Sequence, residues 1–297
     1  MAFRLKPDEQ VSEGLRRLAR KELGNAAKSV GRRGGDREKA IHDARRAVKK
    51  ARAIVEVFEN DCGRGLGKVR KRLRRVSRSL SELRDADIKV ETLDALHLRA
   101  PSALPHATFT LMRRLLRQDR DALVRDSQMR ARLDEAAKTL KKARRDAARW
   151  RSRHKNLRAL LAAVKAARRD GRAAMKRAED SHTAEDFHAW RKAVKTLMYE
   201  LRLVAAAGPE IRAEIRALRY IERWLGVDHN VVVLWDRLIH DDRLSRAWSD
   251  VAPLQEASGR YQQELRQKAL ERGARVYATP PASAAVLRRR WREWRDH

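Results

Sequence analysis

The sequence predicts an all-α protein, and three observations lead to that prediction. Apolar residues recur at helical spacing from Pro7 onward, almost to the end of the chain. No convincing stretch alternates apolar and polar residues with the β-branched content of a strand. Hydrophobic residues make up 42% of the 297 residues, which is enough to bury one large core or two ordinary ones.

Clusters of glycine, proline and serine divide the helical pattern into about eight or nine helices. The expected breaks lie at 31–35, 63–67, 101–105, 181–185, 208–209, near Pro253, and at 280–281.

An internal repeat is the most informative feature of the chain. The segment IHDARRAVKKAR begins at Ile41, and the segment FHAWRKAVKTLM begins at Phe187. A shift of 146 residues aligns the two segments without a gap and superimposes their basic positions. The aligned pairs are His42 with His188, Arg45 with Arg191, Arg46 with Lys192, and Lys49 with Lys195. Such self-similarity indicates a repeated structural unit.

The helices that follow these segments correspond at a shift of 145 residues. The apolar residues Leu66, Leu73, Val76 and Leu80 fall on Ile211, Leu218, Ile221 and Leu225, and the basic residues Lys71, Arg74 and Arg78 fall on Arg216, Arg219 and Arg223. An exit turn is expected after each helix, with Asp85 opposite Asp228. We therefore predict two pseudo-symmetric four-helix bundles produced by duplication, over 1–149 and 150–279, which form one domain. Residues 280–297 are expected to be a basic C-terminal helix or tail.

The charge of the chain predicts an anionic partner. Lysine and arginine total 71 against 40 acidic residues, which leaves a formal net charge of +31. Such an excess favours association with nucleic acid, an acidic membrane surface or a phosphate polymer. No stretch is long and apolar enough to span a membrane, and the start of the chain lacks the apolar core of a secretory signal. The single cysteine, Cys62, cannot form an internal disulfide. A cytoplasmic location is therefore expected.

Each copy of the repeated helix is expected to bury one face and to present cations on another. At the helical rotation of about 100° per residue, His42, Arg45 and Lys49 occupy an arc of about 60° away from the apolar seam. His188, Arg191 and Lys195 repeat this arc. If the two halves pack about an approximate two-fold axis, the arcs align into one basic central groove or pore. A polyanion bound there would release counterions, so its affinity should fall steeply with salt and rise at mildly acidic pH through histidine protonation.

The pattern H-x-x-R-[RK]-x-x-K, present in two helical copies, resembles the CHAD family, the conserved histidine α-helical domain. The resemblance runs from about Asp8 to about Tyr277 and implies a pair of four-helix bundles, a basic central surface, and non-enzymatic binding of inorganic polyphosphate, with targeting to polyphosphate granules. The motif residues then become ligand contacts: His42, Arg45, Arg46, Lys49, His188, Arg191, Lys192 and Lys195. Their helix faces add Arg52, Lys71, Arg74, Arg78, Arg216, Arg219 and Arg223. Met198 stands where the first copy has Arg52, so the half-sites are expected to differ.

Other readings of the sequence stay open. A nucleic-acid-binding or other polyanion-binding helical protein is the alternative, although no homeodomain, zinc-finger, RNA-recognition or basic-zipper signature is found. An enzymatic phosphohydrolase or transferase is a third reading, but neither a phosphate-cradling glycine loop nor a paired acidic cluster is found. No cofactor, metal or catalytic residue is therefore predicted. The chain also lacks the β-rich pattern and ExExK signature of the triphosphate-tunnel domain that accompanies many CHAD domains, so a stand-alone protein is expected.

Several conspicuous residues are expected to be structural. Asp85 and Asp228 are interpreted as helix caps. Trp190, Trp224 and Trp235 are expected to fill the core, and the last helix to dock on the bundle. The histidines without a partner in the repeat are expected to be surface or capping residues: His97, His106, His154, His182, His229 and His240.

Overall fold

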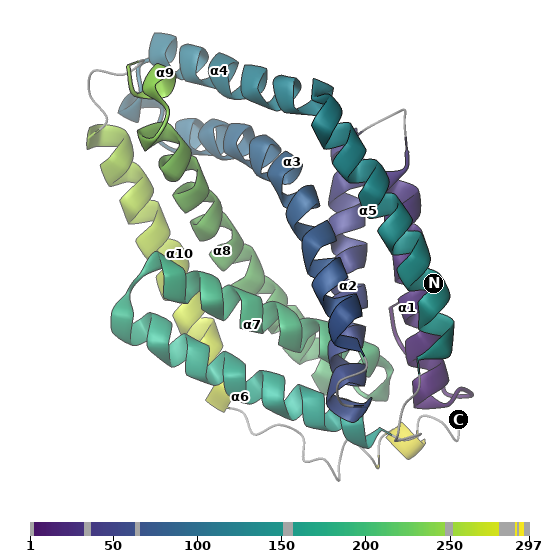
Figure 1. Cartoon of the computed structure of the whole chain (residues 1–297). Coiled ribbons are helices and arrows are strands. Elements are labelled where there is room, and N and C mark those ends of the chain that lie inside the picture. Colours follow the sequence, from purple (N-terminus) through teal and green to yellow (C-terminus); the bar gives the residue numbers. More distant parts are fainter. Residues whose placement is uncertain are drawn as a thin grey trace.

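The computed structural model describes residues 3–32, 37–62, 66–150, 157–246, 252–278, 289 and 291–293, and its regular elements are helices (Figure 1). They are α1 (Val11–Val30), α2 (Arg37–Cys62), α3 (Gly67–Arg99), α4 (His106–Arg125), α5 (Ser127–Asp146), α6 (Arg158–Ser181), α7 (Ala184–Leu203), α8 (Pro209–Ile239), α9 (Asp242–Ser245) and α10 (Ala252–Ala278). Short 3-10 turns cover Pro101–Ala103, Ala147–Arg149 and Ala205–Ala207. The all-α prediction is confirmed. Among the described helices, none combines the length and apolarity that a bilayer-spanning segment requires.

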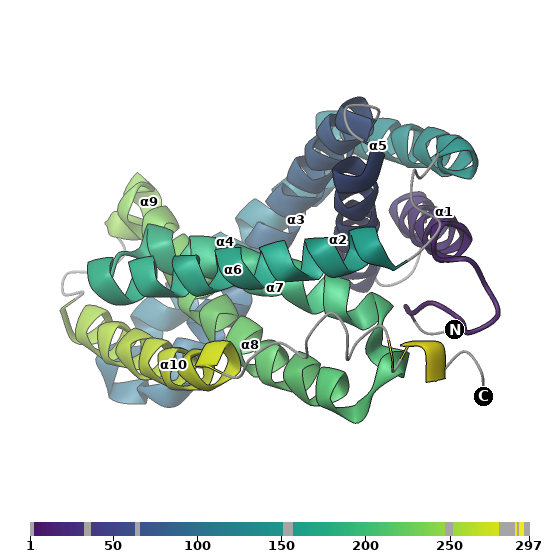
Figure 2. The ribbon, with the colours of Figure 1, turned by 90° about the horizontal axis from the view of Figure 1, so that it is seen from below.

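The helices pack in two groups. In the first, α1 packs on α2 and α5, and α3 packs on α2 and α5; in the second, α6 packs on α7 and α10, and α8 packs on α7 and α10. Figure 2 shows α6, α7, α8 and α10 on one side of the molecule and α1, α2 and α5 on the other. The groups meet where α3 contacts α8 and α2 contacts α6 and α7. This packing agrees with halves of about four long helices each, whereas the duplication itself stays a prediction.

One hydrophobic core runs through both groups. Fully buried side chains from the first group, such as Phe58 and Leu73, belong to the same cluster as Phe187 and Trp190 from the second. The N-terminal segment also joins the groups, because the Leu5 backbone N–H donates to the Leu203 carbonyl at 3.1 Å. The fold is therefore continuous across the predicted boundary near Trp150. Trp190 is confirmed as a core residue, and Trp224 and Trp235 pack against the core while partly buried.

The ends of the helices follow local sequence signals. The Thr183 hydroxyl accepts a hydrogen bond from the Asp186 backbone N–H at 3.3 Å and caps the start of α7. His182, which ends α6, adopts the left-handed conformation with φ of 55°, so its predicted capping role is confirmed. The buried indole of Trp291 agrees with docking of the C-terminal segment on the core. The expected break at 280–281 lies outside the described residues.

One helix boundary was not predicted. The break between α4 and α5 falls at Asp126, whose carboxylate accepts hydrogen bonds from the backbone N–H groups of Gln128 and Met129. The Asp126–Ser127 pair is a typical N-terminal capping signal, and it divides a stretch that the sequence pattern left as one. The first group therefore contains the additional helix α4, which packs on α3 and α5.

The predicted exit turns after residues 80 and 225 are wrong. Helix α3 continues to Arg99 and α8 continues to Ile239 without interruption. Beyond the expected turns, Leu93 of α3 and Val231 and Leu234 of α8 are fully buried in a second apolar cluster with the start of α10. Burial there outweighs the weak helix propensity of the β-branched run after Asn230, so both helices stay intact.

Candidate anion-binding site

The four helices that carry the repeat line a partly open cavity of about 430 Å³. It lies where α2 and α3 of the first group meet α7 and α8 of the second. We call it the central cavity, and it is lined by Arg45, Lys49, Arg52, Ala53, Glu56, Ser81, Asp85, Ile88, His188, Arg191, Lys192, Lys195, Thr196, Tyr199, His229, Asn230 and Val233. Six of these residues are lysine or arginine and two are carboxylic acids, so the lining has an excess of positive charge.

Helix α2 supplies Arg45, Lys49 and Arg52 to the central cavity. Their spacing of four and three residues places them on one face, while Val48 and Val55 of the same helix are buried in the core. The Arg45 guanidinium donates a hydrogen bond from Nη1 to the Leu80 carbonyl oxygen at 3.1 Å. This bond fixes the arginine against α3 and leaves its other N–H groups for a ligand.

Helix α7 supplies His188, Arg191, Lys192 and Lys195 to the opposite wall. Glu222 of α8 partly neutralises this wall, since its Oε1 lies 2.7 Å from Nζ of Lys195 and 4.0 Å from Nη2 of Arg191. Burial acts against ionisation of Glu222, but the Lys195 charge and hydrogen bond outweigh it and lower the Glu222 pKa. Within the described chain, the Arg191 Nε–H is buried and has no hydrogen-bond partner. The wall therefore holds a buried donor that its own side chains leave unsatisfied.

Burial and mutual repulsion lower the pKa values of the lysines that face each other across the cavity. Burial, together with the charges of Lys195, Arg45 and Arg191, lowers the pKa of Lys49 to about 7. Burial and the Arg191 charge also lower the pKa of Lys195, while Glu222 acts in the opposite direction. Near neutral pH a fraction of Lys49 is therefore unprotonated, and an anion entering the cavity would restore its charge.

Two histidine rings of the cavity lining lie against each other at a tilt. The ring centroids of His188 and His229 are 3.9 Å apart, and His188 Nδ1 is buried without a hydrogen-bond partner in the described structure. Burial, with the charges of Lys192, Arg191 and Lys195, lowers the pKa of His188 to about 4. Burial and the proximity of His188 lower the pKa of His229 to about 3. Both rings are neutral at pH 7 and can each donate one hydrogen bond.

The expectation that His229 is a surface or capping residue is wrong, because its side chain lines the cavity against His188. The sequence contained a signal for it. Since α3 and α8 are uninterrupted, the shift of 145 residues continues along them and pairs Arg84 with His229 and Asp85 with Asn230. Asp85 and Asn230 both line the cavity, so this register matches the structure better than the pairing of Asp85 with Asp228.

Neither Asp85 nor Asp228 is a helix cap, because both lie in helix interiors. Asp228 is 2% exposed, and its Oδ1 accepts hydrogen bonds from Arg266 Nε at 2.8 Å and Gln262 Nε2 at 3.1 Å. Asp228 therefore links α10 to α8, which is a structural role other than the predicted helix capping. Burial raises the pKa of Asp85, while the charge of Arg45 opposes this rise.

The two motif histidines occupy different environments. His42 is exposed and does not line the cavity, whereas His188 does. Partial desolvation of its ring and the charge of Arg84 lower the pKa of His42. Arg84 is held by bonds to Glu91 at 2.8 and 2.9 Å and to Glu38 at 3.1 Å. Arg52 lines the cavity, but Met198, its counterpart in the repeat, is buried and does not, which agrees with unequal half-sites.

The remaining predicted contacts lie outside the cavity. Arg46 faces a separate hollow of about 350 Å³ between α1 and α2, which also contains the ion pair of Lys50 with Glu22. The predicted contacts on α3 and α8 are exposed: Lys71, Arg74, Arg78, Arg216, Arg219 and Arg223. Arg74 approaches the cavity residue Arg52 closely enough for its charge to lower the Arg52 pKa, after the larger effect of burial. These residues stay predicted contacts outside the cavity.

Comparison with known proteins assigns this architecture. The sequence model of the CHAD domain matches residues 9–239. The chain belongs to the CHAD domain family. The crystal structure of the CHAD domain from the plant Ricinus communis superimposes with a TM-score of 0.64 at 18% identity, covering 95% of this chain and 96% of that chain. At this identity the similarity establishes the fold of the CHAD protein but transfers no residue roles. The comparison with curated proteins gave no match.

Proposed function

We propose that this CHAD protein binds inorganic polyphosphate in the central cavity without catalysing a reaction. One observation carries the proposal: cations from α2 and α7 surround one cavity of about 430 Å³, and two of its polar groups, Arg191 Nε and His188 Nδ1, are buried with no partner in the described structure. Phosphate oxygens are strong acceptors that match guanidinium and imidazole donors. A bound phosphate chain would satisfy these donors and neutralise the facing lysines.

A linear phosphate polymer fits the cavity better than nucleic acid does. The aromatic residues among those that line it are Tyr199 and the two histidines, and His188 and His229 already contact each other. Single-strand binding proteins stack successive bases on aromatic rings, and this lining offers no such series. Family membership supports the same ligand, since the resemblance of the repeated motif to CHAD domains implies polyphosphate binding. Targeting to polyphosphate granules follows as part of this proposal.

The test compares variants that lose equal charge. Arg52→Gln with Lys192→Gln removes one cation from each wall, and neither side chain makes a hydrogen bond or salt bridge to another described residue. Arg130→Gln with Arg145→Gln, two exposed residues of α5 outside the cavity, is the matched control. We expect the cavity variant to bind long-chain polyphosphate at least about tenfold more weakly, because charge-assisted bonds are lost. Its salt dependence should also decrease, by about 0.7 in the logarithmic slope for each cation.

Equal effects of the two variants would contradict binding in the cavity. Ready displacement of polyphosphate by single-stranded DNA of equal charge, at one fixed salt concentration, would favour the nucleic-acid reading instead. The non-enzymatic part has its own assay. Release of orthophosphate from polyphosphate by the wild-type protein, abolished by His188→Asn, would show catalysis.

A further inference from the structure

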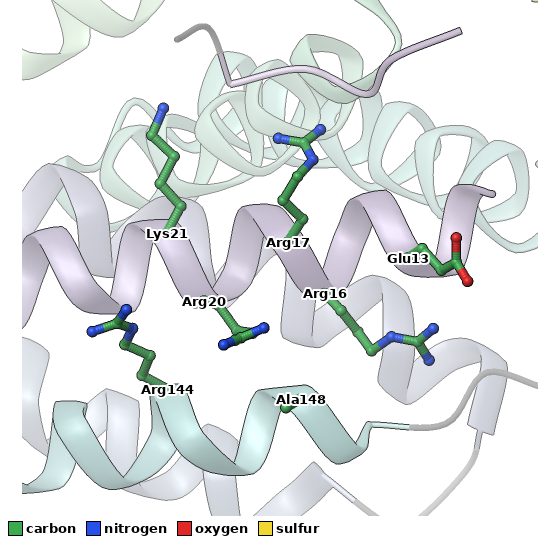
Figure 3. A pocket seen from close by; sticks show the side chains of 7 residues that line it. All are labelled: Glu13, Arg16, Arg17, Arg20, Lys21, Arg144 and Ala148. Atoms are coloured by element: carbon green, nitrogen blue, oxygen red, sulfur yellow. The ribbon is translucent and has the colours of Figure 1, made fainter. Parts of the chain in front are cut away.

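A second basic hollow lies on the outer side of the first helix group, between α1 and α5 (Figure 3). It has a volume of about 360 Å³, and none of its lining residues lines the central cavity. Helix α1 contributes Arg16, Arg17, Arg20 and Lys21, and α5 contributes Arg144. Glu13 is the single acid among the lining residues. We call this hollow the outer groove.

Intramolecular contacts hold two of these arginines. The Arg16 guanidinium donates from Nη1 to the Trp150 carbonyl oxygen at 3.0 Å, and the Arg17 guanidinium donates from Nε to Glu9 at 2.8 Å. Arg20 and Arg144 are exposed and make no hydrogen bond or salt bridge to another residue of the described structure. In Figure 3, Arg16, Arg20 and Arg144 lie between α1 and α5, while Arg17 and Lys21 point to the other side of α1.

Small residues shape the outer groove. A side chain at Gly24 would place its Cβ 3.3 Å from Nε of Arg144, so the Arg144 side chain rests directly on the backbone of α1. Ala148, in the 3-10 turn that follows α5, lines the groove beyond Arg144. The absence of bulk at these two positions lets guanidinium groups from both helices share one space.

This arrangement is unfavourable without a ligand. Arg16 and Arg20 are four residues apart on one helix, a spacing at which like charges destabilise. Arg144 adds a third guanidinium from the neighbouring helix, and the acid that could offset them, Glu13, is exposed one turn before Arg16. Planar guanidinium groups bind two oxygens of one phosphate, which makes a phosphate-bearing anion the matching ligand class.

The lining also indicates which phosphate compound fits. It contains no aromatic ring on which a base could stack and no large apolar side chain that could enter a bilayer. We propose that the outer groove binds a second segment of a linear phosphate polymer. The central cavity lies on the other side of the α1–α2 packing, so one molecule would hold two polymer segments. This cross-linking rests on the proposed function of the cavity, whereas binding in the outer groove does not.

The experiment separates the two sites with inorganic tripolyphosphate as the probe. Isothermal titration calorimetry of the full chain is expected to show two binding steps. Arg20→Gln with Arg144→Gln should remove one step, and Arg52→Gln with Lys192→Gln should remove the other. The control pair, Arg130→Gln with Arg145→Gln, loses the same charge and should keep both. With long-chain polyphosphate, light scattering should rise for the wild-type protein and stay low for both single-site variants.

Each failure is distinguishable. If Arg52→Gln with Lys192→Gln keeps both binding steps, the proposed function of the cavity is refuted while the outer groove proposal stands. If the Arg20 and Arg144 variant titrates like the control pair, the outer groove is not a phosphate site. In the cavity variant, only the outer groove is expected to bind tripolyphosphate. If a single-stranded oligonucleotide displaces tripolyphosphate from it as readily as a phosphate polymer does, the assigned ligand class is wrong.

Discussion

The imidazole rings of His188 and His229 lie 3.9 Å apart on the wall of the central cavity, with an angle of 31° between their planes. One ring comes from α7 and the other from α8, so the pair joins two helices of the second group. Three cations, Arg191, Lys192 and Lys195, surround the pair and oppose its protonation. The pair is therefore sensitive both to pH and to any anion that neutralises this wall.

The first prediction concerns stability in acid. The pKa of His188 falls from 6.5 to about 4, and that of His229 from 6.5 to about 3, on folding. The unfolded chain therefore binds more protons in this interval, and the free energy of unfolding should decrease as the pH falls from 6.5 toward 4. Chemical denaturation at several pH values should show a shallower decrease for His229→Asn. The exposed His240→Asn serves as the control and should retain the wild-type slope.

Bound polyphosphate should oppose the loss of stability in acid, because its negative charge raises the pKa values of His188 and His229. Calorimetry at pH 6 in buffers of different ionisation enthalpy is expected to show proton uptake on binding by the wild-type protein. Uptake that His188→Asn leaves unchanged would exclude the pair as its source.

The second prediction concerns the lysines. Lys195→Gln removes a positive charge that lowers the Lys49 pKa and frees Glu222, whose charge raises it. The Lys49 pKa should therefore rise above about 7, although burial keeps it below the ordinary value of 10.5. NMR titration of the lysine side chains can follow this change, with Lys138→Gln on the exposed face of α5 as control. An unchanged Lys49 pKa would mean that the two ammonium groups do not interact.

The third prediction separates the two aspartates. Asp228→Asn weakens the attachment of α10 by Arg266 and should lower the free energy of unfolding by about 2 kcal/mol while leaving polyphosphate affinity unchanged. Asp85→Asn removes a carboxylate from the cavity and should tighten binding severalfold at little cost in stability. Thermal unfolding and a binding titration on both variants provide the comparison. The interpretation is wrong if the two substitutions exchange these effects.

The fourth prediction concerns Glu200 of α7, which is 2% exposed and whose Oε2 has no hydrogen-bond partner in the described residues. Burial, with the charges of Glu56 and Asp170, raises its pKa to about 8. The folded state therefore retains a proton that the unfolded chain releases near pH 4.5, so stability should decrease as the pH rises toward 8. At pH 9 the free energy of unfolding of Glu200→Gln should exceed that of the wild type. The wild type loses about 1.36 kcal/mol for each pH unit between the unfolded and folded pKa values of Glu200. Parallel stability profiles for the two proteins would show that Glu200 ionises normally.

The helices were predictable because their apolar seams are long and regular. The seam of α2, with Val48 and Val55, is buried as its spacing indicated. The continuation of α3 past Leu80 and of α8 past Leu225 was not predictable in the same way. Local propensity disfavours a helix through the valines after Asn230, and only the distant partners of Val231 in the second apolar cluster reverse that preference.

The candidate site was predictable in part. Spacing placed Arg45, Lys49, Arg191 and Lys195 on one face of each helix, and all of them line the cavity. Spacing alone did not indicate that α2 turns His42 outward while α7 turns His188 inward, because this depends on how the helices cross. His229 required the 145-residue register to be continued past Leu225, and the assumed exit turn prevented that.

The central cavity takes three of its lysines and arginines from α2 and three from α7, and these helices belong to different groups. A polyanion bound to both walls would therefore link the two halves of the chain reversibly. Low salt would strengthen this link and high salt would weaken it by screening the charges. The mechanical coupling of the halves would therefore depend on the ionic strength of the surroundings.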